Sequence, residues 1–289
     1  MRESLKRLLP KALGNYVNFL ACIAPKTAAR KAFAIFSKPR RGWVGNHHKP
    51  FLDPARKERL SLKNIELQTY HWPGTGKRIL LTHGWESHTH RYKNLVATLS
   101  AAGYDIYAFD APAQGYSNGN RLYVPIYEEA LQRVKEAYKP HFIIAHSLGA
   151  MTAIYNQYKN PADYVEKMVI LGAADKLEDI LSDYQKIIGM SNRAMTALDK
   201  YFIKRFGFKK EEFSSSAFAK AIDLPALIVH DKGDLITRPS GSKNIYENWK
   251  NARLLLTEGL DHSLYGDEVN DAIIDFLKEE EPTPKNPRS

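Results

Sequence analysis

Residues 142–150 have the sequence Phe142-Ile143-Ile144-Ala145-His146-Ser147-Leu148-Gly149-Ala150, in which an apolar run leads through one serine into a helix-forming segment. A sharp turn from strand to helix strains the residue at the junction and exposes its side chain. Strand and helix pass close together there, so the positions two before and two after must be small. Ala145 and Gly149 meet this requirement, which makes Ser147 a candidate nucleophile.

Outward from this turn, short apolar runs alternate with longer amphipathic segments. Several of the runs are continuous in Ile, Leu and Val, which is typical of strands buried on both faces of a parallel sheet. One amphipathic segment places Val269, Ile273 and Phe276 on a single helical face. The strand candidates are residues 65–70, 79–82, 105–109, 142–145, 168–171, 226–229 and 254–257.

The alternation predicts an α/β fold, a mainly parallel sheet with helices on both faces. We expect the domain to span residues 61–278, with a small helical cap inserted at about 173–221, where helical spacing continues without a strand signal. Residues 1–60 are expected to form a basic N-terminal arm, with a helix around 28–36, followed by an extended linker. Residues 279–289 are rich in acid and proline and predict a polar tail.

A serine hydroxyl needs a base within hydrogen-bond reach, and the base needs an anion to orient it. The loop after the 226–229 strand contains Asp231 and Asp234, and the loop after the 254–257 strand contains His262. Both loops emerge at the carboxyl edge of the predicted sheet, where Ser147 also lies. His262 is the only one of the ten histidines that follows the last strand.

These motifs resemble the α/β-hydrolase superfamily, in particular its esterase, lipase and peptidase-like branch. His83-Gly84-Trp85 resembles the oxyanion-hole segment of the family, and residues 109–117 resemble the segment after the next strand, with Ala113-Gln114 where the family usually has Gly-His. The order Ser, Asp, His is also that of the family. The resemblance implies Ser147, Asp234 and His262 as catalytic residues and the backbone amides of Trp85 and Leu148 as the oxyanion hole.

Several alternatives stay open beside this interpretation. Asp231 could orient the base, with Asp234 capping a turn. His83 is expected to brace its loop and His146 to be packed or solvent-facing. His88 and His90 lack the acid and further histidine of a di-zinc site, and residues 74–77 precede a strand, so no metal and no phosphate loop is predicted.

The predicted function is hydrolysis of a carboxylic ester or related acyl compound through an acyl-enzyme on Ser147, without a cofactor. An acyltransferase or thioesterase could use the same three residues, and a catalytically inactive binding module could use the same fold. The residues do not identify the acyl chain, the bond type or the oligomeric state.

The net charge of +10 is confined to the N-terminus, because residues 1–50 contain 11 Lys or Arg and one acid, Glu3. A basic segment ahead of a neutral domain does not predict a nucleic-acid partner. With Phe33, Ile35 and Phe36 it could attach weakly to an anionic membrane surface, although a helix packed on the domain is the preferred interpretation.

Localisation is predicted to be cytoplasmic. Cys22 is the single cysteine, so no internal disulfide is available. No run reaches the roughly 18 apolar residues of a membrane span. Export through the short apolar run at residues 16–24 is the less favoured alternative, because Glu3 and Pro10 lie in its leader.

Overall fold

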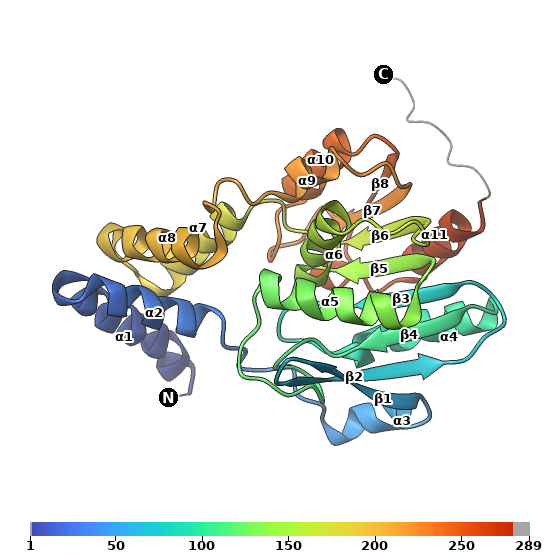
Figure 1. Cartoon of the computed structure of the whole chain (residues 1–289), viewed down its shortest axis with the longest axis horizontal. Coiled ribbons are helices and arrows are strands. Elements are labelled where there is room, and N and C mark those ends of the chain that lie inside the picture. Colours follow the sequence, from blue (N-terminus) through green and yellow to red (C-terminus); the bar gives the residue numbers. More distant parts are fainter. Residues whose placement is uncertain (1, 280–289) are drawn as a thin grey trace. The chain divides into compact units, whose positions relative to one another are not determined.

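Eight strands form one sheet in the computed structural model, which describes residues 2–279 (Figure 1). Their order across the sheet is β1-β2-β4-β3-β5-β6-β7-β8. β2 pairs antiparallel with β1 and with β4, and all other pairs are parallel. The strands are β1 (Arg56–Leu62), β2 (Ile65–Trp72), β3 (Arg78–Thr82), β4 (Asp105–Phe109), β5 (Phe142–His146), β6 (Lys167–Leu171), β7 (Ala226–Asp231) and β8 (Ala252–Thr257).

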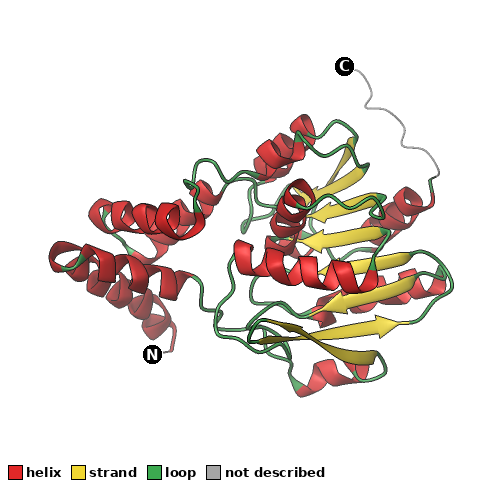
Figure 2. Cartoon of the chain, viewed as in Figure 1, coloured by secondary structure: helices red, strands yellow, loops and turns green. Residues whose placement is uncertain are grey.

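Helices cover both faces of this sheet (Figure 2). Successive strand residues point to opposite faces, so each face has its own core. Leu80 and Ile143 belong to the cluster that includes residues of α5 (Val124–Tyr138) and α6 (Leu148–Lys159). Their neighbours Leu81 and Ile144 belong to the cluster that includes residues of α4 (Lys93–Ala101) and α11 (Asp267–Lys278). Burial on both faces accounts for the continuous apolar runs and confirms the predicted fold class.

The first strand, β1, differs from the sequence prediction, which placed its arm and linker over residues 1–60. The predicted boundary lies inside β1. This strand is at the edge of the sheet and has the sequence RKERLSL, whose charged residues conceal a strand signal. The segment before it is not simply extended, because it contains a 3-10 turn (Asn46–His48) and the short helix α3 (Lys49–Leu52).

Four helices form a second compact unit, made of residues 1–38 and 176–214, while residues 39–175 and 215–289 form the sheet unit. The helices are α1 (Arg2–Ile23), α2 (Pro25–Phe36), α7 (Leu177–Ile188) and α8 (Asn192–Phe206). The sequence predicted α2 approximately, but not α1. Gly14 of α1 allows close packing here, since a Cβ at this position would lie 1.8 Å from the carbonyl oxygen of Ile188.

The remaining helices belong to the sheet unit and follow β6 and β7 in the chain. They are α9 (Ser215–Ala219) and α10 (Pro239–Asn248), and both contribute to the same core as α5 and α6. The predicted cap range of 173–221 therefore contains α7, α8 and α9. Of the predicted tail, residues 280–289 lie outside the described residues. Between residues 2 and 279, no helix is both long and apolar enough to cross a membrane.

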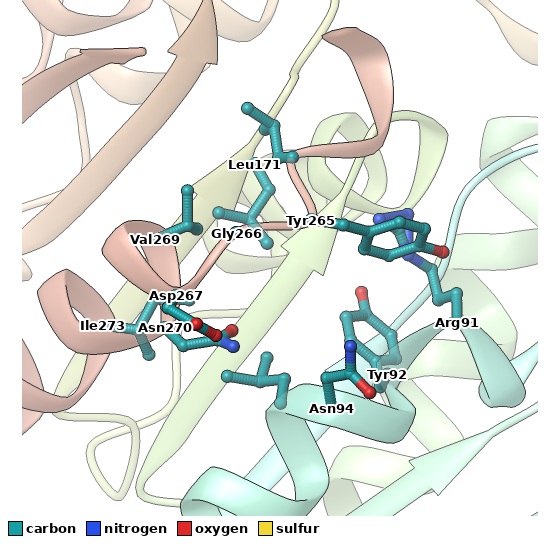
Figure 3. A pocket seen from close by; sticks show the side chains of 12 residues that line it. Arg91, Tyr92, Asn94, Leu171, Tyr265, Gly266, Asp267, Val269, Asn270 and Ile273 are labelled. Carbon is teal, nitrogen blue, oxygen red and sulfur yellow. The ribbon is translucent and has the colours of Figure 1, made fainter. Parts of the chain in front are cut away.

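A pocket of about 300 Å³ lies in the sheet unit between α4 and α11 (Figure 3). Its apolar lining includes Leu95, Leu171 and Ile273, and its polar lining includes Arg91 and Asn270. Arg91 donates a hydrogen bond of 2.9 Å to the carbonyl oxygen of Ser263. The pocket therefore adjoins the segment that follows His262.

Candidate active site

The predicted turn from strand to helix is present at Ser147. β5 ends at His146 and α6 begins at Leu148, and the serine between them has φ 54° and ψ −119°. Such a positive φ is strained for any residue with a Cβ, so the surrounding contacts must hold it. Ser147 donates its backbone N–H to the carbonyl oxygen of Leu171 at 2.8 Å. A Cβ at Gly149 would lie 2.5 Å from the carbonyl oxygen of His83, which explains why glycine is needed there.

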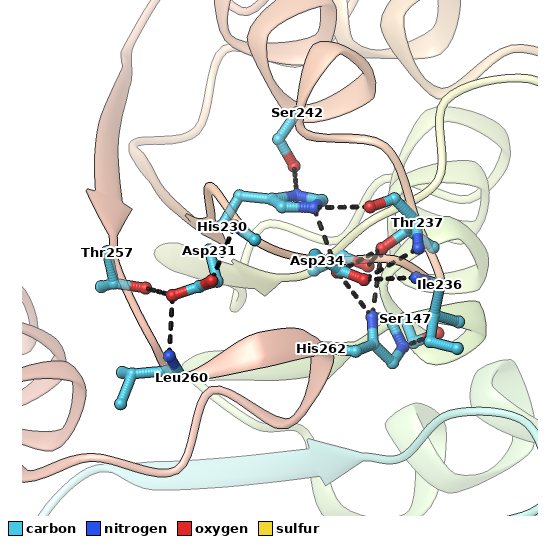
Figure 4. A network of polar contacts seen from close by, with 12 residues as sticks. Ser147, His230, Asp231, Asp234, Ile236, Thr237, Ser242, Thr257, Leu260 and His262 are labelled. Atoms are coloured by element: carbon cyan, nitrogen blue, oxygen red, sulfur yellow. Dashed lines mark hydrogen bonds and ion pairs between the residues drawn. The ribbon is translucent and has the colours of Figure 1, made fainter.

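The structure brings together the three side chains predicted to act (Figure 4). Nε2 of His262 lies 2.9 Å from Oγ of Ser147, and Nδ1 of His262 lies 2.7 Å from Oδ2 of Asp234. An ionised carboxylate can only accept, so Nδ1 carries the imidazole proton and Nε2 is free to accept from the serine hydroxyl. Ser147, Asp234 and His262 follow the ends of β5, β7 and β8. These three strands are parallel, so their carboxyl ends meet at one edge of the sheet.

Asp234 is held in its ionised form. Burial alone raises the pKa of a carboxyl group, but here hydrogen bonds from His230, His262 and Thr237 outweigh burial and hold the pKa of Asp234 well below its usual value. Its Oδ1 accepts the backbone N–H groups of Ile236 and Thr237 at 2.7 and 3.0 Å. The carboxylate is thus charged and fixed in direction.

Asp231, the alternative acid, has different partners. Its Oδ2 accepts from the Thr257 hydroxyl and from the backbone N–H of Leu260, both at 2.9 Å, and its Oδ1 accepts from the N–H of Gly233 at 2.8 Å. The side chain is fully buried. Asp231 therefore joins the end of β7 to the loop that leads to His262.

The predicted oxyanion-hole amides belong to residues beside the serine. Leu148 is the first residue of α6, and the first N–H groups of a helix have no acceptor within it. Trp85 follows Gly84, where a Cβ would lie 2.9 Å from the Cβ of Ser147. Both backbone segments therefore run next to the nucleophile.

The loop that contains Trp85 is braced by His83, as expected from the sequence, and also by Gln114 and Asp110, for which no such role was predicted. His83 donates from Nδ1 to the carbonyl oxygen of Gly84 and accepts at Nε2 from the N–H of Ala111, both at 2.9 Å. Oε1 of the buried Gln114 accepts from the N–H of Ser87 at 2.7 Å. Asp110 accepts from the N–H of Thr89 at 2.9 Å. Gln114, at the position where the family usually has histidine, thus makes a hydrogen bond to this loop.

His146 is packed rather than solvent-facing. Burial, with Arg91 and His262 nearby, holds the pKa of His146 well below its usual value, so the ring is neutral. Its Nε2 lies 2.8 Å from the carbonyl oxygen of His262, which can only accept, and Nε2 therefore carries the proton. Among residues 9–279, whose side chains are described, no group of three or more His, Cys, Asp or Glu side chains is arranged to hold a metal ion.

The sequence of this chain is similar to those of several known proteins. A family model described as Serine aminopeptidase, S33 matches residues 75–212. A monoacylglycerol lipase of Mycolicibacterium smegmatis is 22% identical over 246 residues, which cover 70% of this chain and 88% of that protein. An uncharacterized abhydrolase domain-containing protein of Dictyostelium discoideum is 22% identical over 240 residues, which cover 70% of this chain. The match spans only 26% of that second relative's length.

Solved structures agree in fold. An esterase from Pyrococcus furiosus superimposes with a TM-score of 0.61 at 21% identity, covering 83% of this chain and 96% of that one. Identity this low establishes the architecture and not the substrate. The strand order, the turn at Ser147 and these solved structures together confirm that the chain has the α/β-hydrolase fold, which the resemblance seen in the sequence implied.

Proposed function

We propose that the protein is a serine hydrolase that cleaves a carboxylic ester through an acyl-enzyme on Ser147. The observation that carries the proposal is the relay of hydrogen bonds from Ser147 to His262 at 2.9 Å and from His262 to Asp234 at 2.7 Å. A hydroxyl, a neutral imidazole and a carboxylate in this order are the parts that acyl transfer to serine requires.

In the first half of the proposed cycle, Oγ of Ser147 attacks the ester carbonyl carbon while Nε2 of His262 takes the hydroxyl proton. The imidazolium that forms is stabilised by the charge of Asp234. The carbonyl oxygen becomes an oxyanion, which the N–H groups of Trp85 and Leu148 are proposed to bind, at about 3 kcal/mol of barrier for each donor. His262 then protonates the leaving alcohol as the carbon–oxygen bond breaks.

In the second half, a water molecule attacks the acyl-enzyme. Nε2 of His262 accepts a proton from this water, and the same oxyanion donors act again. The bond to Oγ breaks, the serine recovers its proton from His262, and the carboxylic acid leaves. The cycle uses only side chains, backbone amides and water.

The choice of ester as substrate class draws support from the relatives, which include a monoacylglycerol lipase and an esterase. Thioester hydrolysis and acyl transfer use the same three residues. They differ only in the leaving group and the acceptor, which separate substrates can distinguish.

A panel of p-nitrophenyl esters from acetate to palmitate, with an acyl-coenzyme A thioester and an aminoacyl anilide beside it, tests the proposal. We expect ester turnover, and we expect Ser147→Ala to lower kcat by at least about 1,000-fold with unchanged thermal unfolding. Turnover of the thioester or anilide alone contradicts the ester assignment. Equal ester turnover by wild type and Ser147→Ala contradicts the acyl-enzyme.

A further inference from the structure

Helix α1 has two apolar faces. On its inner face, Gly14, Val17 and Ala21 are buried in the helical unit. On another face, four large apolar side chains are exposed, and we call them the outer stripe: Leu9 (58%), Tyr16 (47%), Phe19 (62%) and Ile23 (66%).

The spacing of the outer stripe places its members on one side of the helix. Steps of seven, three and four residues return to nearly the same direction at 3.6 residues per turn, and the exposed Ala12 fills the longer gap. The stripe is about 21 Å long at 1.5 Å per residue. A helix that only covers a core has a polar opposite face, so a second apolar face needs a second apolar environment.

The charge of the surrounding unit indicates which environment this is. Its two segments, 1–38 and 176–214, contain 16 Lys or Arg and 7 Asp or Glu, for a net charge of +9. Residues 1–38 contain one acid, Glu3. Lys26, Arg30 and Lys31 on the next helix are exposed. This charge attracts an anionic surface and opposes the approach of a second, equally basic copy.

Two of the apolar side chains that could attach to a membrane, Phe33 and Phe36, instead pack against aromatic rings within the helical unit. Phe33 is fully buried, and its ring lies 5.3 Å from that of Tyr201 and 5.7 Å from that of Phe202. Phe36 packs its ring 5.1 Å from that of Tyr184. The exposed apolar surface is instead the outer stripe of α1.

We propose that the outer stripe of α1 is a docking surface for anionic lipid bilayers. The helix lies in the plane of the interface, the four large side chains enter the boundary between headgroups and acyl chains, and the net positive charge of the helical unit attracts the anionic headgroups. The proposal is independent of the chemistry at Ser147.

Co-sedimentation of the full chain with sucrose-loaded vesicles tests this surface. We expect binding to phosphatidylcholine vesicles that contain phosphatidylglycerol, weak binding to pure phosphatidylcholine, and loss of binding as salt rises from about 0.1 M to about 1 M. The double variant Phe19→Glu with Ile23→Glu should lower the partition coefficient by at least about tenfold. Trp43→Glu, at a side chain that is 58% exposed in the sheet unit, should leave it unchanged.

Circular dichroism and thermal unfolding of each variant show whether the fold is retained, which the exposure of both side chains leads us to expect. Equal sedimentation with and without phosphatidylglycerol, or equal partitioning of wild type and the double variant, overturns the proposal. Analytical ultracentrifugation tests whether a second copy of the chain binds the outer stripe instead of a membrane. A wild-type dimer that the double variant dissociates would assign the stripe to self-association and overturn membrane docking.

Discussion

Nε2 of His230 lies 3.2 Å from Oδ2 of Asp234, the same carboxylate oxygen that pairs with His262. His230 is fully buried, and its Nδ1 lies 2.6 Å from the hydroxyl of Ser242. Its Nε2 also lies 3.1 Å from the carbonyl oxygen of Thr237, which can only accept, so this nitrogen carries a proton. The one proton on Nε2 thus lies between the carbonyl oxygen of Thr237 and the carboxylate of Asp234, and this contact makes His230 a candidate positioning residue for Asp234.

Replacing His230 with leucine removes this donor. The loss of a charge-assisted hydrogen bond worth about 1.5 kcal/mol corresponds to about tenfold in kcat. The carboxylate then faces one imidazole in place of two and stabilises the His262 imidazolium more strongly, so the acidic limb of the pH–rate profile should move to higher pH. His230→Gln, which keeps an N–H donor, should stay closer to wild type. Superimposable pH profiles for wild type and His230→Leu would refute this role.

The two aspartates of the 231–234 loop should respond differently to substitution. Asp234→Asn replaces the oriented anion and should lower kcat by about 10³- to 10⁴-fold. Asp231→Asn turns one accepting oxygen into an amino group that faces an N–H or hydroxyl donor, which should cost about 1–3 kcal/mol of unfolding free energy. Ester kinetics and urea unfolding of both variants measure the difference. A larger kcat loss for Asp231→Asn than for Asp234→Asn would reverse the assignment.

Acid should selectively remove the stability that Asp234 provides. Its pKa in the folded chain is lowered from the usual 3.8, so the unfolded chain binds a proton first as pH falls. This stabilisation is complete well above pH 3.8 and declines below it, by at most about 1.4 kcal/mol per pH unit. Urea unfolding from pH 7 to pH 3 should show the gap between wild type and Asp234→Asn narrowing as pH falls. A constant gap would contradict the lowered pKa.

The central strands could be predicted because two-sided burial imposes continuous apolar runs, as in Ile79-Leu80-Leu81. β1 could not, because an edge strand with one neighbour tolerates the charged sequence RKERLSL. α1 was also missed. Its apolar residues lie on two faces, so the sequence shows no single amphipathic stripe. Pro10 and Gly14 also disfavour a helix, and only the structure identifies the helices against which α1 packs.

At the site, Ser147 and His262 could be proposed because each follows a strand at one sheet edge, where parallel strands bring loops together, and the family resemblance implied Asp234 rather than Asp231. The supporting contacts could not be predicted. Gln114 and His146 act through hydrogen bonds to residues far away in the chain, such as that from His146 to the carbonyl oxygen of His262, and His230 acts through contacts set by the conformation of its own loop. Such partners depend on loop geometry, and neither spacing nor composition specifies it.

Labelling with a fluorophosphonate probe tests the central claim most directly. The wild-type protein should become covalently modified on the peptide that contains Ser147, as read by mass spectrometry, because a serine activated by His262 attacks the phosphorus. The His262→Ala variant should label at least about 100-fold more slowly, since it lacks the base. A folded wild-type protein that stays unmodified, or that is modified at another residue, would contradict the proposed nucleophile.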